Sequence, residues 1–190
     1  MYPVSDGFLR AVKSNTRKYY WTGTIVTRGG MTYEFGAKEI VKGSGYISRQ
    51  CCGSTEIELG TVYAAEMGIT LLSDIDRYTL EGALVTLVFH LVLVDGSVED
   101  VPMGVFEVSE ANRLAKCLEL KAYDFMLRFD KSFNGFETVG TAYDFIALCC
   151  KMCRVEFAHK RAEIDAMPNG GVTLSVYTEN DIENCRAVLI

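Results

Sequence analysis

Apolar side chains recur at every second position along much of the first 120 residues, a spacing typical of half-buried β-strands. Between residues 82 and 94 one face is apolar throughout, while Thr86 and His90 interrupt the other. A second alternating stretch runs from residue 56 to 71, and only Thr61 interrupts its apolar face. Both stretches predict long strands with one face in a core. The opposite face of the second stretch carries three acidic residues, Glu56, Glu58 and Glu66.

Turn signals between these strands predict antiparallel pairing. Arg28-Gly29-Gly30 separates two stretches rich in β-branched and aromatic residues, 21–27 and 31–35, and so predicts a hairpin. Asp95-Gly96 follows the strand at 82–94 and is a strong hairpin signal. Return strands are expected around 105–108 and 118–122. Successive antiparallel strands joined by tight turns are typical of sandwiches and barrels.

The apolar spacing changes to that of helices near residue 122. Apolar residues at 142, 145, 146, 149, 152 and 153 share one helical face, and a weaker helical spacing runs from 122 to 133. A turn at 169–171 precedes an expected strand at 172–177, and residues 178–181 resemble a capping box that opens a last helix. Because no C-cap signal closes that helix, we expect an incomplete unit.

These patterns predict an α+β fold with two domains. Residues 1–122 are expected to form an antiparallel β-barrel domain. Residues 123–190 are expected to form the start of a small α/β unit, and the opening residues 7–18 give a poor signal for either a helix or a strand.

Composition excludes several classes of protein. Of the 190 residues, 49% are hydrophobic and 23% are charged, which is a globular balance. The net charge of −6 argues against non-specific binding to nucleic-acid phosphates. The sequence has no run of the roughly 18–20 apolar residues that a membrane span needs, and its N-terminus lacks signal-peptide features. We expect maturation in a cytoplasm, where thiols are mostly reduced.

Charge is divided unevenly along the chain. Residues 1–50 hold 8 Lys and Arg against 3 Asp and Glu, whereas residues 51–110 hold Arg77 alone against 11 acids. This division has two interpretations. The two charged segments can lie on separate solvated faces, or they can bring copies of the chain together.

Motifs for catalysis are missing from the sequence. Neither His90 nor His159 stands beside a nucleophile motif, and the chain has no Gly-x-Ser-x-Gly elbow, phosphate-binding loop or dinucleotide fingerprint. We therefore expect no enzymatic activity and no cofactor, and a structural role for His90.

The cysteines raise the question of a metal site. Cys150-x-x-Cys153, with Cys149 and the vicinal Cys51-Cys52, could offer thiolates to zinc. Cys149 and Cys153 nevertheless fall on the apolar stripe of a predicted helix, where free cysteine behaves as a small hydrophobe. Only one pair has the spacing of a zinc knuckle, so we expect no metal site.

Five motifs occur in an order that resembles a known family. They are Ile47-Ser48-Arg49-Gln50-Cys51-Cys52, the stretch 56–66, Asp76-Arg77-Tyr78 with Leu80-Glu81-Gly82-Ala83, the stretch 101–111, and Ala122-Tyr123-Asp124 with Met126 and Asp130-Lys131. The series resembles the N-terminal region of siphophage and prophage baseplate hub proteins, also called tail-associated lysin or tail endopeptidase proteins. The resemblance runs from about residue 20 to beyond residue 145.

This resemblance implies a phage tail-tube-like β-barrel followed by an α/β insertion. It also implies a virion structural protein at the tail tip, assembled in the bacterial cytoplasm as a homotrimer and without stable membrane insertion. The implied partners are the distal tail protein, the tape-measure protein and a spike or fibre, and DNA passes through the ring without specific binding. Lumen or subunit-interface positions are then expected at Glu56, Glu58 and Glu66.

Two other hypotheses remain open. The chain could be the N-terminal anchoring region of a tail-associated cell-wall hydrolase whose catalytic domain lies downstream. It could also be a stand-alone ligand-binding β-barrel with a cysteine metal site.

Overall fold

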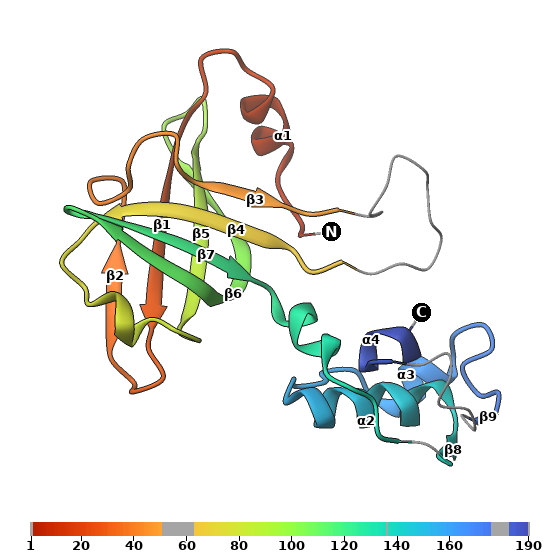
Figure 1. Ribbon diagram of the computed structural model, residues 1–190. Coiled ribbons are helices and arrows are strands. Elements are labelled where there is room, and N and C mark those ends of the chain that lie inside the picture. Colours follow the sequence, from red (N-terminus) through yellow and green to blue (C-terminus); the bar gives the residue numbers. More distant parts are fainter. Residues whose placement is uncertain (1, 51–62, 136, 176–182, 190) are drawn as a thin grey trace. The chain divides into compact units, whose positions relative to one another are not determined.

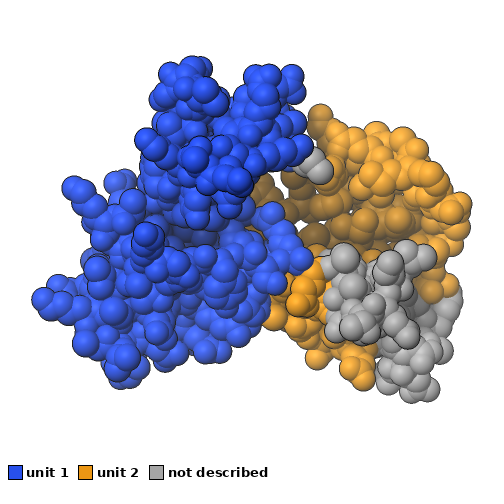
Figure 2. All heavy atoms as spheres, turned by 90° about the horizontal axis from the view of Figure 1, so that it is seen from above, with its two compact units in different colours: residues 1–49, 65–124 blue, residues 50–64, 125–190 orange. Residues whose placement is uncertain are grey.

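A seven-stranded antiparallel sheet accounts for most of the N-terminal part of the protein (Figure 1). The computed structural model describes residues 2–50, 63–135, 137–175 and 183–189. Two compact units make up the chain: unit 1 comprises residues 1–49 and 65–124, and unit 2 comprises residues 50–64 and 125–190 (Figure 2). The domain boundary expected at residue 122 stays a prediction.

Unit 1 contains the sheet and one short helix, α1 (Asp6–Val12). Along the sheet the strands follow the order β2-β1-β5-β6-β7-β4-β3, and every neighbouring pair is antiparallel. A 3-10 helix, η1 (Arg77–Thr79), precedes β5. The strands are β1 (Lys18–Val26), β2 (Thr32–Phe35), β3 (Tyr46–Ser48), β4 (Glu66–Leu72), β5 (Leu84–Val92), β6 (Val98–Leu114) and β7 (Cys117–Tyr123).

The core of unit 1 lies inside the curled sheet. Figure 1 shows β4 and β7 crossing β1 and β5 at a steep angle, as the right-handed twist of strands produces in a curled sheet. Each of these four strands contributes fully buried side chains to one cluster, including Ile25, Val85, Met67 and Leu118. The period-two pattern at 82–94 is confirmed, because Val85, Leu87 and Leu91 are all buried.

The hairpin between β5 and β6 has a three-residue loop. Leu93 N donates to Ser97 O at 2.8 Å, and Gly96 N donates to Leu93 O at 3.0 Å. Gly96 has φ of 86°, a left-handed conformation that glycine adopts without steric cost. This geometry is that of a type I turn followed by a left-handed residue. The turn predicted at Asp95-Gly96 is thereby confirmed.

The expected barrel is wrong in one respect, since the sheet does not close. β2 and β3 end the sheet, and no strand in the described part of the chain pairs with the outer side of either. The physical reason lies in the segment after β2. Ile40 forms a bridge to Leu71, and Val41 N donates to Thr70 O at 2.9 Å, so this segment occupies the edge of β4. Only three residues remain for β3.

The other strand predictions have mixed outcomes. The hairpin predicted at 21–27 and 31–35 is confirmed by the pairing of Gly23–Val26 with Thr32–Phe35. The return strands predicted at 105–108 and 118–122 fall within β6 and β7. For the long strand expected at 56–71, the structure has β4 from Glu66, and residues 51–62 lie outside the described residues.

Unit 2 is mainly helical. It contains a 3-10 helix, η2 (Phe125–Asp130), two α-helices, α2 (Ala142–Cys153) and α3 (Arg161–Asp165), and a short one, α4 (Cys185–Val188). Strands β8 (Val139–Gly140) and β9 (Leu174–Ser175) pair antiparallel. The predicted helix at 142–153 is confirmed. The weaker spacing from 122 differs, because Ala122 belongs to β7.

We expect Gly96→Ala to destabilise unit 1 by about 1 kcal/mol, because a Cβ penalises the left-handed conformation by ~1–2 kcal/mol. Urea denaturation followed by circular dichroism measures the change. Val94→Ala is the matched control in the same loop, because Val94 is 97% exposed and should alter stability little. Equal midpoints for both variants would contradict the assigned turn.

Candidate functional site: the outer face of the sheet

A chain of hydrogen bonds crosses the solvent side of three neighbouring strands. Thr22 Oγ1 on β1 lies 2.7 Å from His90 Nε2 on β5. The other ring nitrogen, His90 Nδ1, lies 2.6 Å from Asp100 Oδ1 on β6. The ring of Tyr20 stacks on the imidazole with centroids 4.5 Å apart and planes 12° apart. We call these four residues the histidine relay.

Strand register explains why these residues meet. His90 pairs directly with Tyr20 on one side and with Asp100 on the other. Each side chain therefore points to the same face of the sheet. The pairing with Asp100 depends on the three-residue loop at Gly96, because a two-residue loop would place a different residue opposite the imidazole.

The order hydroxyl, imidazole, carboxylate is that of an activated nucleophile. One feature separates the relay from a hydrolase triad. A triad carboxylate is buried against the imidazole, whereas the Asp100 side chain is 60% exposed and the His90 side chain 13% exposed. With Nδ1 donating to Asp100, Nε2 accepts from the Thr22 hydroxyl. The relay satisfies a mostly buried imidazole and links β1, β5 and β6.

Sequence reasoning missed the partners of His90. Thr22 lies 68 positions away in the chain, and no local motif marks the pair. The sequence contains a signal for only one partner, Asp100, because the hairpin predicted at Asp95-Gly96 brings Asp100 near His90. Pairing of β1 with β5 carries no comparable signal in the sequence.

A second polar cluster lies on β3, β4 and β7. Tyr46 Oη donates to Glu66 Oε1 at 2.5 Å, and Lys121 Nζ lies 3.4 Å from Glu66 Oε2. The Tyr46 hydroxyl, together with Lys121, holds the pKa of Glu66 below its usual value. The same hydrogen bond raises the pKa of Tyr46. We call Tyr46, Glu66 and Lys121 the Glu66 cluster.

A glycine makes room for this cluster. Tyr46 pairs with Gly68 across β3 and β4, and a Cβ at Gly68 would lie 2.3 Å from Tyr46 Cε1. The aromatic ring therefore covers the glycine directly, a pairing that stabilises edge strands.

The predicted lumen or interface residues fall differently. Glu56 and Glu58 lie outside the described residues. Glu66 lies on the outer face of β4, beside Lys121 and opposite Tyr123. Its role at a lumen or an interface stays a prediction.

The cysteines of unit 2 line its core. Cys149, Cys153 and Cys185 are buried with Phe129 and Phe133 in one apolar cluster. Burial raises the pKa of Cys149 and of Cys153 to about 11, so both thiols are protonated at neutral pH. The apolar stripe predicted for this helix is confirmed by the burial of Cys149 and Cys153.

The described residues contain neither a candidate metal cluster nor a membrane-spanning helix. Across residues 2–50, 63–135, 137–175 and 183–189, no three His, Cys, Asp or Glu side chains gather as a metal ion would require. Cys51 and Cys52 lie outside those ranges. Within them, no helix is long and apolar enough to cross a membrane.

Comparisons with known proteins give little. A scan against protein-family models finds no match, and a search of curated proteins finds none either. Among solved structures, the chain is similar to one in "Virion of native gene transfer agent (GTA) particle", with 12% identity and a TM-score of 0.39. The match covers 63% of this chain and 44% of that chain, so this chain spans less than half of its length.

A double-mutant cycle tests the histidine relay. Thr22→Val and His90→Gln should each destabilise unit 1, and the pair should couple by about 1 kcal/mol, because one hydrogen bond contributes ~0.5–1.5 kcal/mol. Urea denaturation of the parent, the two single variants and the double variant gives the four free energies of unfolding that the cycle needs. Thr24→Val combined with His90→Gln is the control and should be additive within ~0.5 kcal/mol. Equal coupling in both cycles would contradict a direct bond.

Thiol reactivity tests the cysteine cluster. At pH 8 we expect iodoacetamide to modify the half-buried Cys117 faster than Cys149, Cys153 or Cys185, as mapped by peptide mass spectrometry. Burial raises the pKa of Cys149 from 9.0 to about 11, so the unfolded state ionises first as pH rises. Unit 2 should therefore lose stability between pH 9 and 11. Rapid modification of Cys149 at pH 8 would contradict this burial.

Proposed function

We propose that this chain is a structural component of a phage or prophage tail tip, a baseplate hub that forms part of a ring around the DNA channel. One observation carries the proposal: three of the motifs in the sequence meet in the core of one sheet. Gly82 N donates to Val108 O at 2.9 Å, and Val108 N donates to Ala83 O at 2.8 Å. Strand pairing places Ala122 beside Val108.

These motif residues belong to the core of the sheet. Ala83, Val108 and Ala122 are all buried. Because these motifs are far apart in the chain and close together in the core, they contribute to the fold of this sheet. This supports the resemblance to hub proteins at the level of the sheet, and the proposed ring follows from that resemblance.

Two features suit a ring of copies. Both ends of the sheet are unpaired in the described part of the chain, which leaves edges for neighbouring subunits. Basic residues are concentrated in residues 1–50 and acidic ones in residues 51–110. Complementary charge on two parts of one chain favours head-to-tail contacts, which close into a ring when the rotation allows.

The proposed assembly is a homotrimer that binds the distal tail protein, the tape-measure protein and a spike or fibre. DNA would pass through its centre without specific binding. Glu56, Glu58 and Glu66 would line the lumen or a subunit interface. Acidic side chains in a lumen repel phosphates, because binding of DNA requires neutralisation by basic groups.

We propose no catalytic role for this chain. The exposure of Asp100 favours a structural relay over a nucleophile at Thr22. The alternative is an anchoring region for a downstream cell-wall hydrolase, and it implies the same structure for this sheet. The reading frame that encodes the chain distinguishes the two, since a hydrolase domain after Ile190 would favour the alternative.

The location in the particle tests the proposal. In particles produced by the phage or prophage that encodes the chain, gold-labelled antibodies against it should bind the tail tip in electron micrographs. Label confined to heads, or particles that lack the chain altogether, would contradict a hub.

Charge reversal tests the three acidic positions. We expect the triple variant Glu56→Lys, Glu58→Lys and Glu66→Lys to reduce tail assembly or DNA ejection at least tenfold, because basic groups would then face phosphates or a like-charged neighbour. Plaque counts and electron microscopy measure the two effects.

The control reverses three exposed acids elsewhere, Asp74, Glu81 and Glu156, and makes the same change in net charge. If the triple variant assembled and ejected as the parent does, the assignment of these residues would be wrong. An equal defect in the control would show an effect of net charge alone.

A further inference from the structure

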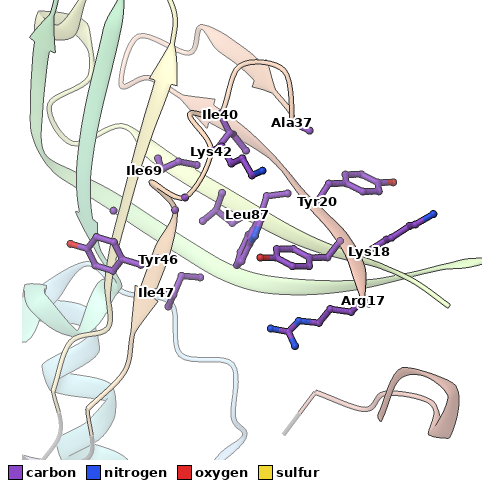
Figure 3. Close-up of a pocket in the computed structure, with 15 residues that line it drawn as sticks. Arg17, Lys18, Tyr20, Ala37, Ile40, Lys42, Tyr46, Ile47, Ile69 and Leu87 are labelled. Carbon is purple, nitrogen blue, oxygen red and sulfur yellow. The ribbon is translucent and has the colours of Figure 1, made fainter. Parts of the chain in front are cut away.

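The unclosed side of the sheet contains a cavity of about 550 Å³ (Figure 3). Its walls come from β1, from the segment that follows β2, from β3 and from β4. All of these elements belong to unit 1. The cavity has the size of a typical ligand site. We call it the opening.

Two strand edges border the opening. β1 pairs with β2 only over Gly23–Val26, so its first five residues, Lys18–Thr22, have no strand beside them on that side in the described chain. β3 pairs only with β4, over Tyr46–Ser48. Every second residue of such an edge directs its N–H and C=O outward. The opening is therefore flanked by unpaired backbone donors and acceptors.

The floor of the opening is apolar. Ile69 and Leu87 are buried core residues, and Trp21, Ile40 and Ile47 pack against the same core. Around this floor, three tyrosines stay 38–52% exposed although their rings are large. They are Tyr19, Tyr20 and Tyr46. Tyr and Trp are enriched where proteins bind partners, because they bury large areas at low entropic cost.

Two cationic side chains, Arg17 and Lys42, lie at different points around the floor. Figure 3 shows Lys42 and Arg17 on opposite sides of Leu87. Both are exposed, and neither has an ion pair among the described residues. The Glu66 cluster differs in this respect, because its acid already has Lys121 as a partner. The charge around the opening is therefore available to an acidic occupant.

We propose that the opening binds an extended acidic segment of a partner protein, which adds to the free edge of β1 as a further strand. Apolar side chains at alternate positions would contact Trp21 and Ile47. Acidic side chains between them would point to the other face, where Lys18 lies, and acidic side chains at the ends of the segment would reach Arg17 and Lys42. The free edge of β1 has five residues, so the partner strand spans roughly 16 Å at ~3.3 Å per residue.

Backbone pairing favours a peptide over a compact apolar ligand. A small molecule would use the floor and leave the edges of β1 and β3 unpaired. A strand satisfies both, because its backbone bonds to the edge and its alternate side chains face the floor. This inference does not rest on the proposed virion role, because it depends only on the residues that border the opening.

The sole tryptophan of the chain, Trp21, reports directly on the opening. The test titrates the full chain with the capped hexapeptide Glu-Val-Glu-Val-Glu-Val and follows tryptophan emission. We expect a saturable shift to shorter wavelength, because a bound strand excludes water from the half-buried indole. The capped hexapeptide Lys-Val-Lys-Val-Lys-Val should give no shift, because its charges repel Arg17 and Lys42.

Two further arms test the mode of binding. The acidic peptide methylated at alternate amide nitrogens lacks the donors for strand addition and should bind at least tenfold more weakly. The double variant Arg17→Gln with Lys42→Gln should bind the unmodified peptide about tenfold more weakly. Each exposed ion pair contributes little by itself, so both cations are replaced together. Lys38→Gln, an exposed lysine outside the opening, should bind as the parent does.

Several results would overturn the inference. They are the absence of a saturable response, an equal response to the basic or the methylated peptide, and unchanged affinity in the double variant. Sedimentation of the chain alone tests another occupant. If the chain forms dimers that Arg17→Gln with Lys42→Gln abolishes, the opening is filled by a second copy and the proposal of a partner segment is wrong.

Discussion

The hairpin of β5 and β6 is the main constraint on the geometry of unit 1, because it supplies the central strand of the sheet, β6, and its neighbour β5. β5 pairs with β1 over nine residues and β6 pairs with β7 over seven. A one-residue slip in a hairpin moves every side chain to the opposite face. The left-handed residue Gly96 therefore sets the register from Val92 to Val88, which brings His90 opposite Asp100, and a bulge between Leu87 and Val88 shifts the register of the remaining pairs.

Closure of this sheet into a barrel depends on contacts other than those that form its strands. Seven strands with a marked twist could close into a barrel, yet the segment after β2 takes the edge of β4. Two backbone hydrogen bonds hold it there, from Leu72 N to Glu39 O and from Val41 N to Thr70 O, and together they form the bridge between Ile40 and Leu71. Once these bonds form, β3 is too short to reach along β1. The opening therefore results from the pairing of the segment after β2 with β4.

Sequence reasoning predicted what local patterns encode. The apolar alternation at 82–94 predicted β5 and its buried face, and the helical stripe at 142–153 predicted α2 with Cys149 in the core. Both depend only on the side-chain periods of strands and helices. The order of strands in the sheet depends on long-range pairing, which periodicity does not encode. For that reason the pattern predicted strands correctly and a closed barrel wrongly.

The functional residues show the same division. Glu66 could be chosen from the sequence as an acid on a polar face, but its neighbours Tyr46 and Lys121 come from strands distant in the chain. Thr22 reaches His90 only through the pairing of β1 with β5. A cross-strand partner leaves no signal near the residue that it contacts, so one sequence cannot reveal it.

The distribution of satisfied and unsatisfied groups over unit 1 has a consequence for its interactions. On the outer face, the histidine relay and the Glu66 cluster pair their polar groups within the chain, and further contacts there would compete with existing hydrogen bonds. At the opening, the backbone edges of β1 and β3 and the cations Arg17 and Lys42 lack such partners among the described residues. Binding costs least where no existing bond has to break, because a lost buried hydrogen bond carries the full desolvation penalty. A partner is therefore favoured at the opening over the more polar outer face.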